Sequence, residues 1–86
     1  MTDIPSTIRV LVAEDNALER STVVDLLGAL GHMVVAEVAS GAEAIECARQ
    51  LTPDAVLLDV HMPGASGVEA AEEIANALPG TAVVLI

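Results

Sequence analysis

The chain has 86 residues, which is enough for one domain with a thin hydrophobic core. It is 53% apolar but contains no Phe, Tyr or Trp, so aliphatic side chains must fill the core and no aromatic ring can stack on nucleic-acid bases. Thirteen acidic residues against three arginines and no lysine give a net charge of −10, which disfavours direct binding to nucleic acid and to anionic membrane surfaces.

We expect a cytoplasmic protein. Its single cysteine, Cys47, cannot form a disulfide within the chain, and the Cys and His residues do not match a zinc site. The chain does not begin with a basic segment followed by an apolar run, and no apolar stretch approaches the roughly 18 residues that span a bilayer. Cys47 is therefore expected to pack as a small apolar side chain.

The first elements predicted are a strand and a helix. Residues 8–13 form an apolar run rich in β-branched side chains, which is typical of a strand covered on both faces of a parallel sheet. A helix follows, because Asn16 and Glu19 resemble a capping box and Gly31 supplies a stop. The apolar side chains at the spacing of one helix face are Val23, Leu26, Leu27 and Leu30.

A second strand and helix come next. Residues 34–39 include the charged Glu37, so this strand is expected to be more exposed and to lie at an edge of the sheet. Ser40 and Glu43 resemble another capping box, and the helix should end before Pro53, because the residue preceding a proline avoids helical geometry. The side chains expected to face the core are Ile45, Ala48 and Leu51.

The last elements repeat this pattern. Residues 55–58 form a buried-strand run that stops at Asp59, and Ser66 with Glu69 resembles a third capping box. The third helix should present apolar side chains inward, namely Val68, Ala71, Ile74, Ala75 and Leu78. Residues 82–86 are predicted to form a fourth strand.

Strands and helices thus alternate, with short links between them. Such alternation implies right-handed crossovers and an open parallel sheet of the α/β class. We expect one domain over residues 8–86, preceded by an N-terminal extension over residues 1–7. In folds of this class, ligands bind outside the carboxyl ends of the strands.

Three acidic side chains follow strands at that end. Glu14 and Asp15 end the first strand and Asp59 ends the third, so their carboxylates should meet at one edge of the sheet. Crowding should raise the pKa of at least one of them. A solvated acidic exterior is the simpler interpretation of single acids, but three converging carboxylates favour a divalent cation with oxygen ligands, which describes Mg²⁺ better than zinc.

These residues resemble a known family, the bacterial response-regulator receiver domain. The resemblance rests on Glu14-Asp15 after the first strand, Asp59 after the third, and Met62-Pro63 with Gly67 in the segment D-V-H-M-P-G-A-S-G. It extends from about Ile8 to the last residue. Within the family, this chain looks most like receivers that precede a helix-turn-helix DNA-binding domain.

The resemblance implies a role in two-component signal transduction. By it, Asp59 accepts a phosphoryl group from a phosphohistidine of a sensor histidine kinase. Asp15 and Asp59 bind Mg²⁺, Glu14 acts through a metal-bound water, and the backbone carbonyl of His61 completes the metal's protein ligands. The side chain of His61 is expected to face solvent. The protein would then be a phosphoacceptor and not an enzyme that releases a product.

The sequence also departs from the family pattern. It lacks the Thr or Ser after the fourth strand and the Lys after the fifth, since Ile86 is the last residue and no lysine is present. The resemblance therefore implies a flavodoxin-like receiver fold without the fifth βα unit, with strand order 2-1-3-4. Residues 82–86 would form a bare apolar edge, so we expect the chain to form a homo-oligomer.

Functions other than a phosphoacceptor make different demands on the sequence. A receiver-like interaction or dimerisation module that is never phosphorylated is the main alternative, favoured by the missing lysine and hydroxyl. An aspartyl phosphatase would need an acid two residues after its nucleophile, where His61 stands. A P-loop nucleotide enzyme would need a lysine.

Overall fold

The computed structural model describes residues 7–62 and 67–86, and strands and helices alternate along this part of the chain. The elements are β1 (Arg9–Ala13), α1 (Ala17–Ala29), β2 (Met33–Val38), α2 (Gly41–Leu51), β3 (Ala55–Leu58), α3 (Gly67–Ala77) and β4 (Ala82–Leu85). The predicted order of elements is confirmed, and each strand begins and ends within one residue of the predicted bounds.

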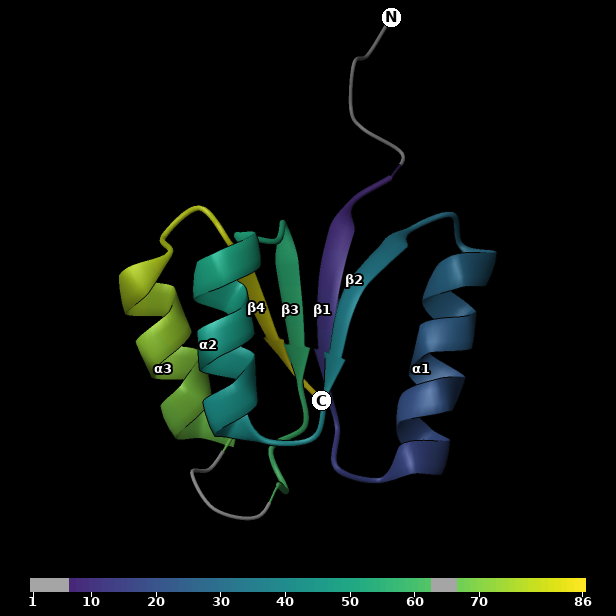
Figure 1. Ribbon diagram of the computed structural model, residues 1–86, viewed down its shortest axis with the longest axis horizontal. Coiled ribbons are helices and arrows are strands. Elements are labelled where there is room, and N and C mark those ends of the chain that lie inside the picture. The colour runs from purple at the N-terminus through teal and green to yellow at the C-terminus, as the bar shows by residue number, and fades with distance from the viewer. Residues whose placement is uncertain (1–6, 63–66) are drawn as a thin grey trace, which may run out of the picture.

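The four described strands form one parallel sheet in the order β2-β1-β3-β4. Among the described helices, α1 lies alone on one face of the sheet, and α2 and α3 lie side by side on the other (Figure 1). The predicted α/β fold, its strand order and the edge position of β2 are therefore confirmed. Because the strands are parallel, their carboxyl ends all lie at the same edge of the sheet.

The core has two parts, one on each face of β1. Leu11 and Ala13 point toward α2 and α3, where Leu58 and Ile74 are also fully buried or nearly so. Val10 and Val12 form a smaller cluster with Ala55 under α1. The predicted burial of β1 on both faces is confirmed. Cys47 is half-buried and packs against the larger cluster, as expected.

The predicted apolar face of α1 is only partly correct. Val23 and Leu27 pack on the sheet together with Val24, but Leu26 is 59% exposed and Leu30 is 62% exposed. No described residue of this helix is fully buried. The physical reason is that none of the other described helices lies on the same face of the sheet as α1, so only a narrow stripe of its surface is covered (Figure 1).

The helices on the other face bury mostly small residues, of which the sequence pattern predicted Ala48 but not Ala44 or Ala70. In α3, Val68 is 47% exposed and Ala75 is exposed, which contradicts the prediction, whereas Ala70 and Ile74 are buried. In α2 the buried positions are Gly41, Ala44 and Ala48. Because α3 packs against both α2 and β4, its buried stripe is set by two neighbours, and small residues let the elements approach closely.

The residues predicted to cap or end the helices do so wherever the structure describes them. The side-chain oxygens of Asn16 and Ser40 accept hydrogen bonds from backbone N–H groups at the starts of α1 and α2. After α1, Gly31 has a φ of +87°, and the N–H of His32 donates to the carbonyl of Leu27, which closes the helix. The predicted cap at Ser66 lies outside the described residues. None of the helices described is long and apolar enough to cross a membrane.

Candidate metal centre

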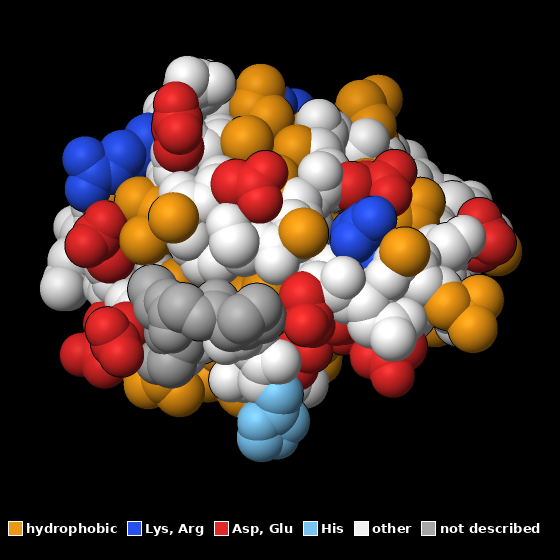
Figure 2. All heavy atoms as spheres, turned by 60° about the horizontal axis from the view of Figure 1, so that its bottom comes forward, with side chains coloured by type: hydrophobic (Ala, Val, Ile, Leu, Met, Phe, Trp, Pro, Cys, Tyr) orange, Lys and Arg blue, Asp and Glu red, His pale blue; other side chains and the backbone are white. Residues whose placement is uncertain are grey.

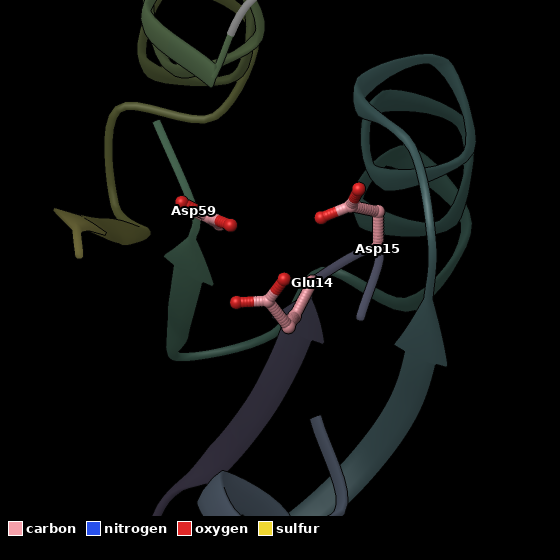
Figure 3. A group of neighbouring side chains, drawn as sticks. All are labelled: Glu14, Asp15 and Asp59. Carbon is pink, nitrogen blue, oxygen red and sulfur yellow. The ribbon is translucent and has the colours of Figure 1, made fainter. Parts of the chain in front are cut away.

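The predicted meeting of three carboxylates at the carboxyl end of the sheet is confirmed. In the sheet, Ala13 of β1 pairs with Leu58 of β3, so Glu14 and Asp59 leave the two strands side by side. Figure 3 shows the side chains of Glu14, Asp15 and Asp59 around one point. An oxygen from each lies within 4.8 Å of an oxygen from the others.

Backbone hydrogen bonds fix the start of each acidic segment. The N–H of Glu14 donates to the carbonyl of Val38 at 3.0 Å, and the N–H of Asp59 donates to the carbonyl of Ala13, also at 3.0 Å. The sheet therefore continues one residue beyond β1 and β3. Because these bonds continue the pairing of the strands, the sheet fixes the backbone position of both acids.

Two further hydrogen bonds orient the carboxylates themselves. Asp59 Oδ1 accepts the backbone N–H of His61 at 2.9 Å, and Glu14 Oε2 accepts the backbone N–H of Asn16 at 3.0 Å. Asn16 was predicted only as a helix cap, and its second role was missed because it depends on the turn between β1 and α1. The side chain of His61 is exposed, as expected.

Gly67 packs directly on the backbone that carries Asp59. A Cβ atom at position 67 would overlap the carbonyl oxygen of Asp59 and lie 2.8 Å from the Cα of Val60. The glycine of the sequence pattern is thus required by a close approach between the start of α3 and the segment after β3.

The surroundings of Glu14 perturb the pKa of its carboxyl group. Burial raises the pKa of Glu14 to about 7, against an ordinary value of 4.5, and the neighbouring carboxyls of Asp15 and Asp59 add to the rise. The N–H of Asn16 acts in the opposite direction. One carboxyl pKa is thus raised, as predicted, but burial and not the predicted crowding is the main cause. Glu14 is buried, Asp59 half-buried and Asp15 exposed, so the cluster opens to solvent on one side.

A cleft of about 860 Å³ lies over the carboxylates. Besides the acids, its walls include Leu18, Thr22 and Val23 of α1, together with His61 and Ile86. Figure 2 shows this end of the molecule, with acidic side chains distributed over its surface. Leu18 and Thr22 were missed as lining residues, because nothing in the helix periodicity distinguishes a residue beside a cleft from one in open solvent.

The donor set fits a hard divalent cation. The three side chains offer only carboxylate oxygens, which suit Mg²⁺ better than a metal that prefers nitrogen or sulfur. A cation would also offset the mutual repulsion that contributes to the raised pKa of Glu14. The fold and the cluster together define an α/β domain with a candidate cation site at the carboxyl ends of β1 and β3.

Comparison with known proteins shows the family to which the chain belongs. Residues 10–86 match the family model of the response regulator receiver domain, and the chain belongs to this family. Over 77 residues it is 44% identical to the transcriptional regulatory protein PdtaR of Mycobacterium tuberculosis, a match covering 90% of this chain and 38% of PdtaR.

Solved structures agree in fold. A two-component response regulator of the LuxR family from Aurantimonas sp. SI85-9A1 superposes with a TM-score of 0.88 at 32% identity, covering 93% of this chain and 58% of that one. The receiver domain of the putative response regulator NarL from Mycobacterium tuberculosis superposes with a TM-score of 0.87 at 38% identity. This match covers 94% of this chain and 66% of that one. The chain thus spans about two fifths of the length of PdtaR and about two thirds of the NarL receiver domain.

Proposed function

We propose that this chain is the phosphoacceptor part of a two-component response regulator, in which Asp59 accepts a phosphoryl group from a phosphohistidine of a sensor histidine kinase. The observation that carries the proposal is the convergence of Glu14, Asp15 and Asp59 within 4.8 Å at the carboxyl ends of two adjacent strands. Family membership of residues 10–86 supports the same role.

In the proposed reaction, an oxygen of Asp59 forms a bond to phosphorus while the bond between phosphorus and the histidine nitrogen breaks. The transition state of such a transfer is loose, so the protein acts mainly by positioning groups and offsetting negative charge. The N–H of His61 holds Oδ1 of Asp59 in place, which fixes the direction of the nucleophile.

Mg²⁺ is the cation that we propose for the cluster. Asp15 and Asp59 would bind it directly, Glu14 through a water, and the backbone carbonyl of His61 would supply a further ligand. When bound, the ion supplies positive charge that stabilises the phosphoryl oxygens during transfer. The burial of Glu14 keeps one wall of the site in a low-dielectric surrounding, which strengthens its interaction with a cation.

Phosphorylation by a small donor tests the proposal. The chain is incubated with acetyl phosphate and Mg²⁺, and its intact mass is measured before and after. We expect the mass to rise by one phosphoryl group, and the rise to be absent with EDTA and in Asp59→Asn. Asp25→Asn is the matched control, because it removes the same charge from an exposed position on α1. An unchanged mass for the parent chain would favour the alternative, a receiver-like interaction module that is not phosphorylated.

We propose that output comes from the remainder of a longer protein. PdtaR is named a transcriptional regulatory protein, and this chain corresponds to only 38% of its length. The net charge of −10 makes this segment itself a poor ligand for nucleic acid. Its role would be to receive the signal as a cytoplasmic phosphoprotein, without turning over a product of its own.

We also propose that the 86-residue chain forms homo-oligomers through β4. This strand lies at an edge of the sheet, and Val84, Leu85 and Ile86 are 44%, 43% and 47% exposed. An apolar edge with unpaired backbone groups recruits another strand, and a two-fold arrangement would give a closed dimer. Sedimentation equilibrium should therefore show a dimer, whereas a monomer that persists at high concentration would contradict the proposal.

A further inference from the structure

Arg20, in the first turn of α1, joins the acidic turn to the edge of the sheet. Its Nη1 donates a hydrogen bond to the backbone carbonyl oxygen of Glu14 at 2.8 Å. Its Nε lies 3.8 Å from Oε1 of Glu37 on β2. The side chain of Arg20 is 24% exposed, so the guanidinium is largely enclosed between these elements.

The other two arginines are engaged elsewhere. Arg9 lies at the amino end of the sheet and donates to the carbonyls of Leu51 and Thr52. Arg49 pairs with Glu73 at 3.7 Å, and both of these side chains are more than half exposed. Arg20 therefore supplies the guanidinium that contacts the acidic turn.

The carbonyl that Arg20 holds belongs to the peptide bond between Glu14 and Asp15. A peptide unit is planar, so fixing its oxygen also fixes the direction in which the chain leaves toward Asp15. The N–H of Glu14 is bonded to Val38 and its carboxylate to Asn16, and the bond from Arg20 adds the remaining constraint. Hydrogen bonds from a charged donor are shorter and stronger than neutral ones.

We propose that Arg20 is a positioning residue, which holds the Glu14-Asp15 peptide so that both carboxylates face the cation of the Asp59 site. This inference rests on the proposed function, because it assumes that the cluster binds a divalent cation. Positioning and simple electrostatics predict opposite changes in cation affinity when Arg20 is removed. A positive side chain near a cation site should weaken cation binding by repulsion, so simple electrostatics predicts that removing Arg20 strengthens binding. Positioning predicts the reverse.

The test is Mg²⁺ binding to the 86-residue chain, measured by isothermal calorimetry at neutral pH. Arg20→Met keeps the length and the helix propensity of the side chain but removes its hydrogen bonds. We expect the Mg²⁺ dissociation constant to rise by about tenfold or more, the usual effect of removing a group that orients metal ligands. Arg49→Met is the matched control, because it removes the same charge from an exposed pair, and its affinity should stay within about twofold of the parent.

Two additional measurements separate positioning from a loss of folding. Urea unfolding without Mg²⁺ shows at which temperatures Arg20→Met is folded. The titration is then run at a temperature at which this variant is folded. Arg20→Lys keeps the positive charge and an ammonium group that can donate a hydrogen bond. We therefore expect it to recover part of the lost Mg²⁺ affinity. If Arg20→Lys binds Mg²⁺ no better than Arg20→Met, the hydrogen bond to Glu14 is not responsible for the lost affinity.

The outcomes distinguish this inference from the proposed function. If the parent chain binds no Mg²⁺, the proposed cation site is wrong and the role of Arg20 falls with it. If the parent binds Mg²⁺ and Arg20→Met binds it equally well or more tightly, the site stands and only the positioning role is overturned. Weaker binding in Arg20→Met, with unchanged binding in Arg49→Met, supports the role.

Discussion

At the amino end of the sheet charged groups meet partners of opposite polarity, whereas at the carboxyl end carboxylates meet one another. The guanidinium of Arg9 donates to the carbonyls of Leu51 and Thr52, which end α2, at 2.9 and 3.0 Å. The carboxylate of Asp54 accepts the N–H of Arg9 at 2.8 Å, and Thr81 Oγ1 donates to the carbonyl of Pro53. These contacts all stabilise the folded chain.

The carboxyl end has the opposite character. Glu14, Asp15 and Asp59 are held close together, and burial with neighbouring carboxyls raises the pKa of Glu14 to about 7. Such an arrangement opposes folding unless a cation offsets it. The contacts at the amino end therefore stabilise the fold. The carboxylate cluster at the carboxyl end opposes folding, and a bound cation would offset that cost.

The largest effect is expected where the start of α3 touches the Asp59 backbone. Gly67→Ala places a methyl group against the carbonyl of Asp59 and the Cα of Val60, which are backbone atoms and cannot move aside easily. We expect the free energy of unfolding to fall by roughly 3 kcal/mol, as for other overpacked sites. Urea unfolding at neutral pH measures the change.

Gly28→Ala is the matched control for that substitution. A Cβ atom at position 28 would meet no atom within 4 Å, and the residue lies inside α1. We therefore expect it to raise the free energy of unfolding by about 0.5–1 kcal/mol through helix propensity. Equal effects of the two substitutions would show that the contact between Gly67 and the Asp59 backbone does not constrain the site.

A smaller effect is expected at the amino end. Arg9→Met removes both hydrogen bonds to the last carbonyls of α2, so the free energy of unfolding should fall by about 2 kcal/mol. The dissociation constant for Mg²⁺ should stay within about twofold of the parent, since Arg9 lies at the opposite edge from the carboxylates. Weaker Mg²⁺ binding in this variant would contradict the separate roles of the two ends of the sheet.

The smallest effect concerns the charge cluster without a cation. Asp59→Asn keeps the shape of the side chain and removes a carboxylate facing Glu14, so it should stabilise the chain in EDTA near neutral pH. We expect a gain of roughly 1 kcal/mol, or about 4–8 °C in melting temperature for a domain of this size. A lower melting temperature than the parent in EDTA would contradict the repulsive cluster.

The same cluster sets the pH dependence of stability. Because the folded pKa of Glu14 is about 7 and its ordinary value is 4.5, the folded state binds more protons in this interval. The contribution of Glu14 to stability is therefore fully present below pH 4.5 and is lost as the pH rises through 7. Thermal melts in EDTA across this range should show that loss, and Glu14→Gln should reduce it.

The fold was predicted from the sequence more completely than the helix faces were. Apolar runs identify the strands, and the two runs that stop at acids place Glu14 and Asp59 at one sheet edge. The exposed Leu26 and Leu30 could not be predicted, because helix periodicity shows an apolar face but not which elements cover it. The bond from Arg20 to the Glu14 carbonyl was missed too, since a backbone acceptor leaves no mark in the sequence.

Direct measurement of Mg²⁺ binding in parent and Asp15→Ala chains tests the central claim, that the carboxyl end of the sheet is a cation site. Asp25→Ala serves as control, because it removes the same charge from an exposed position on α1. We predict that the parent and Asp25→Ala bind Mg²⁺ with similar dissociation constants and that Asp15→Ala binds at least about tenfold more weakly. Equal binding by Asp15→Ala and the parent, or no binding by the parent, would contradict the account.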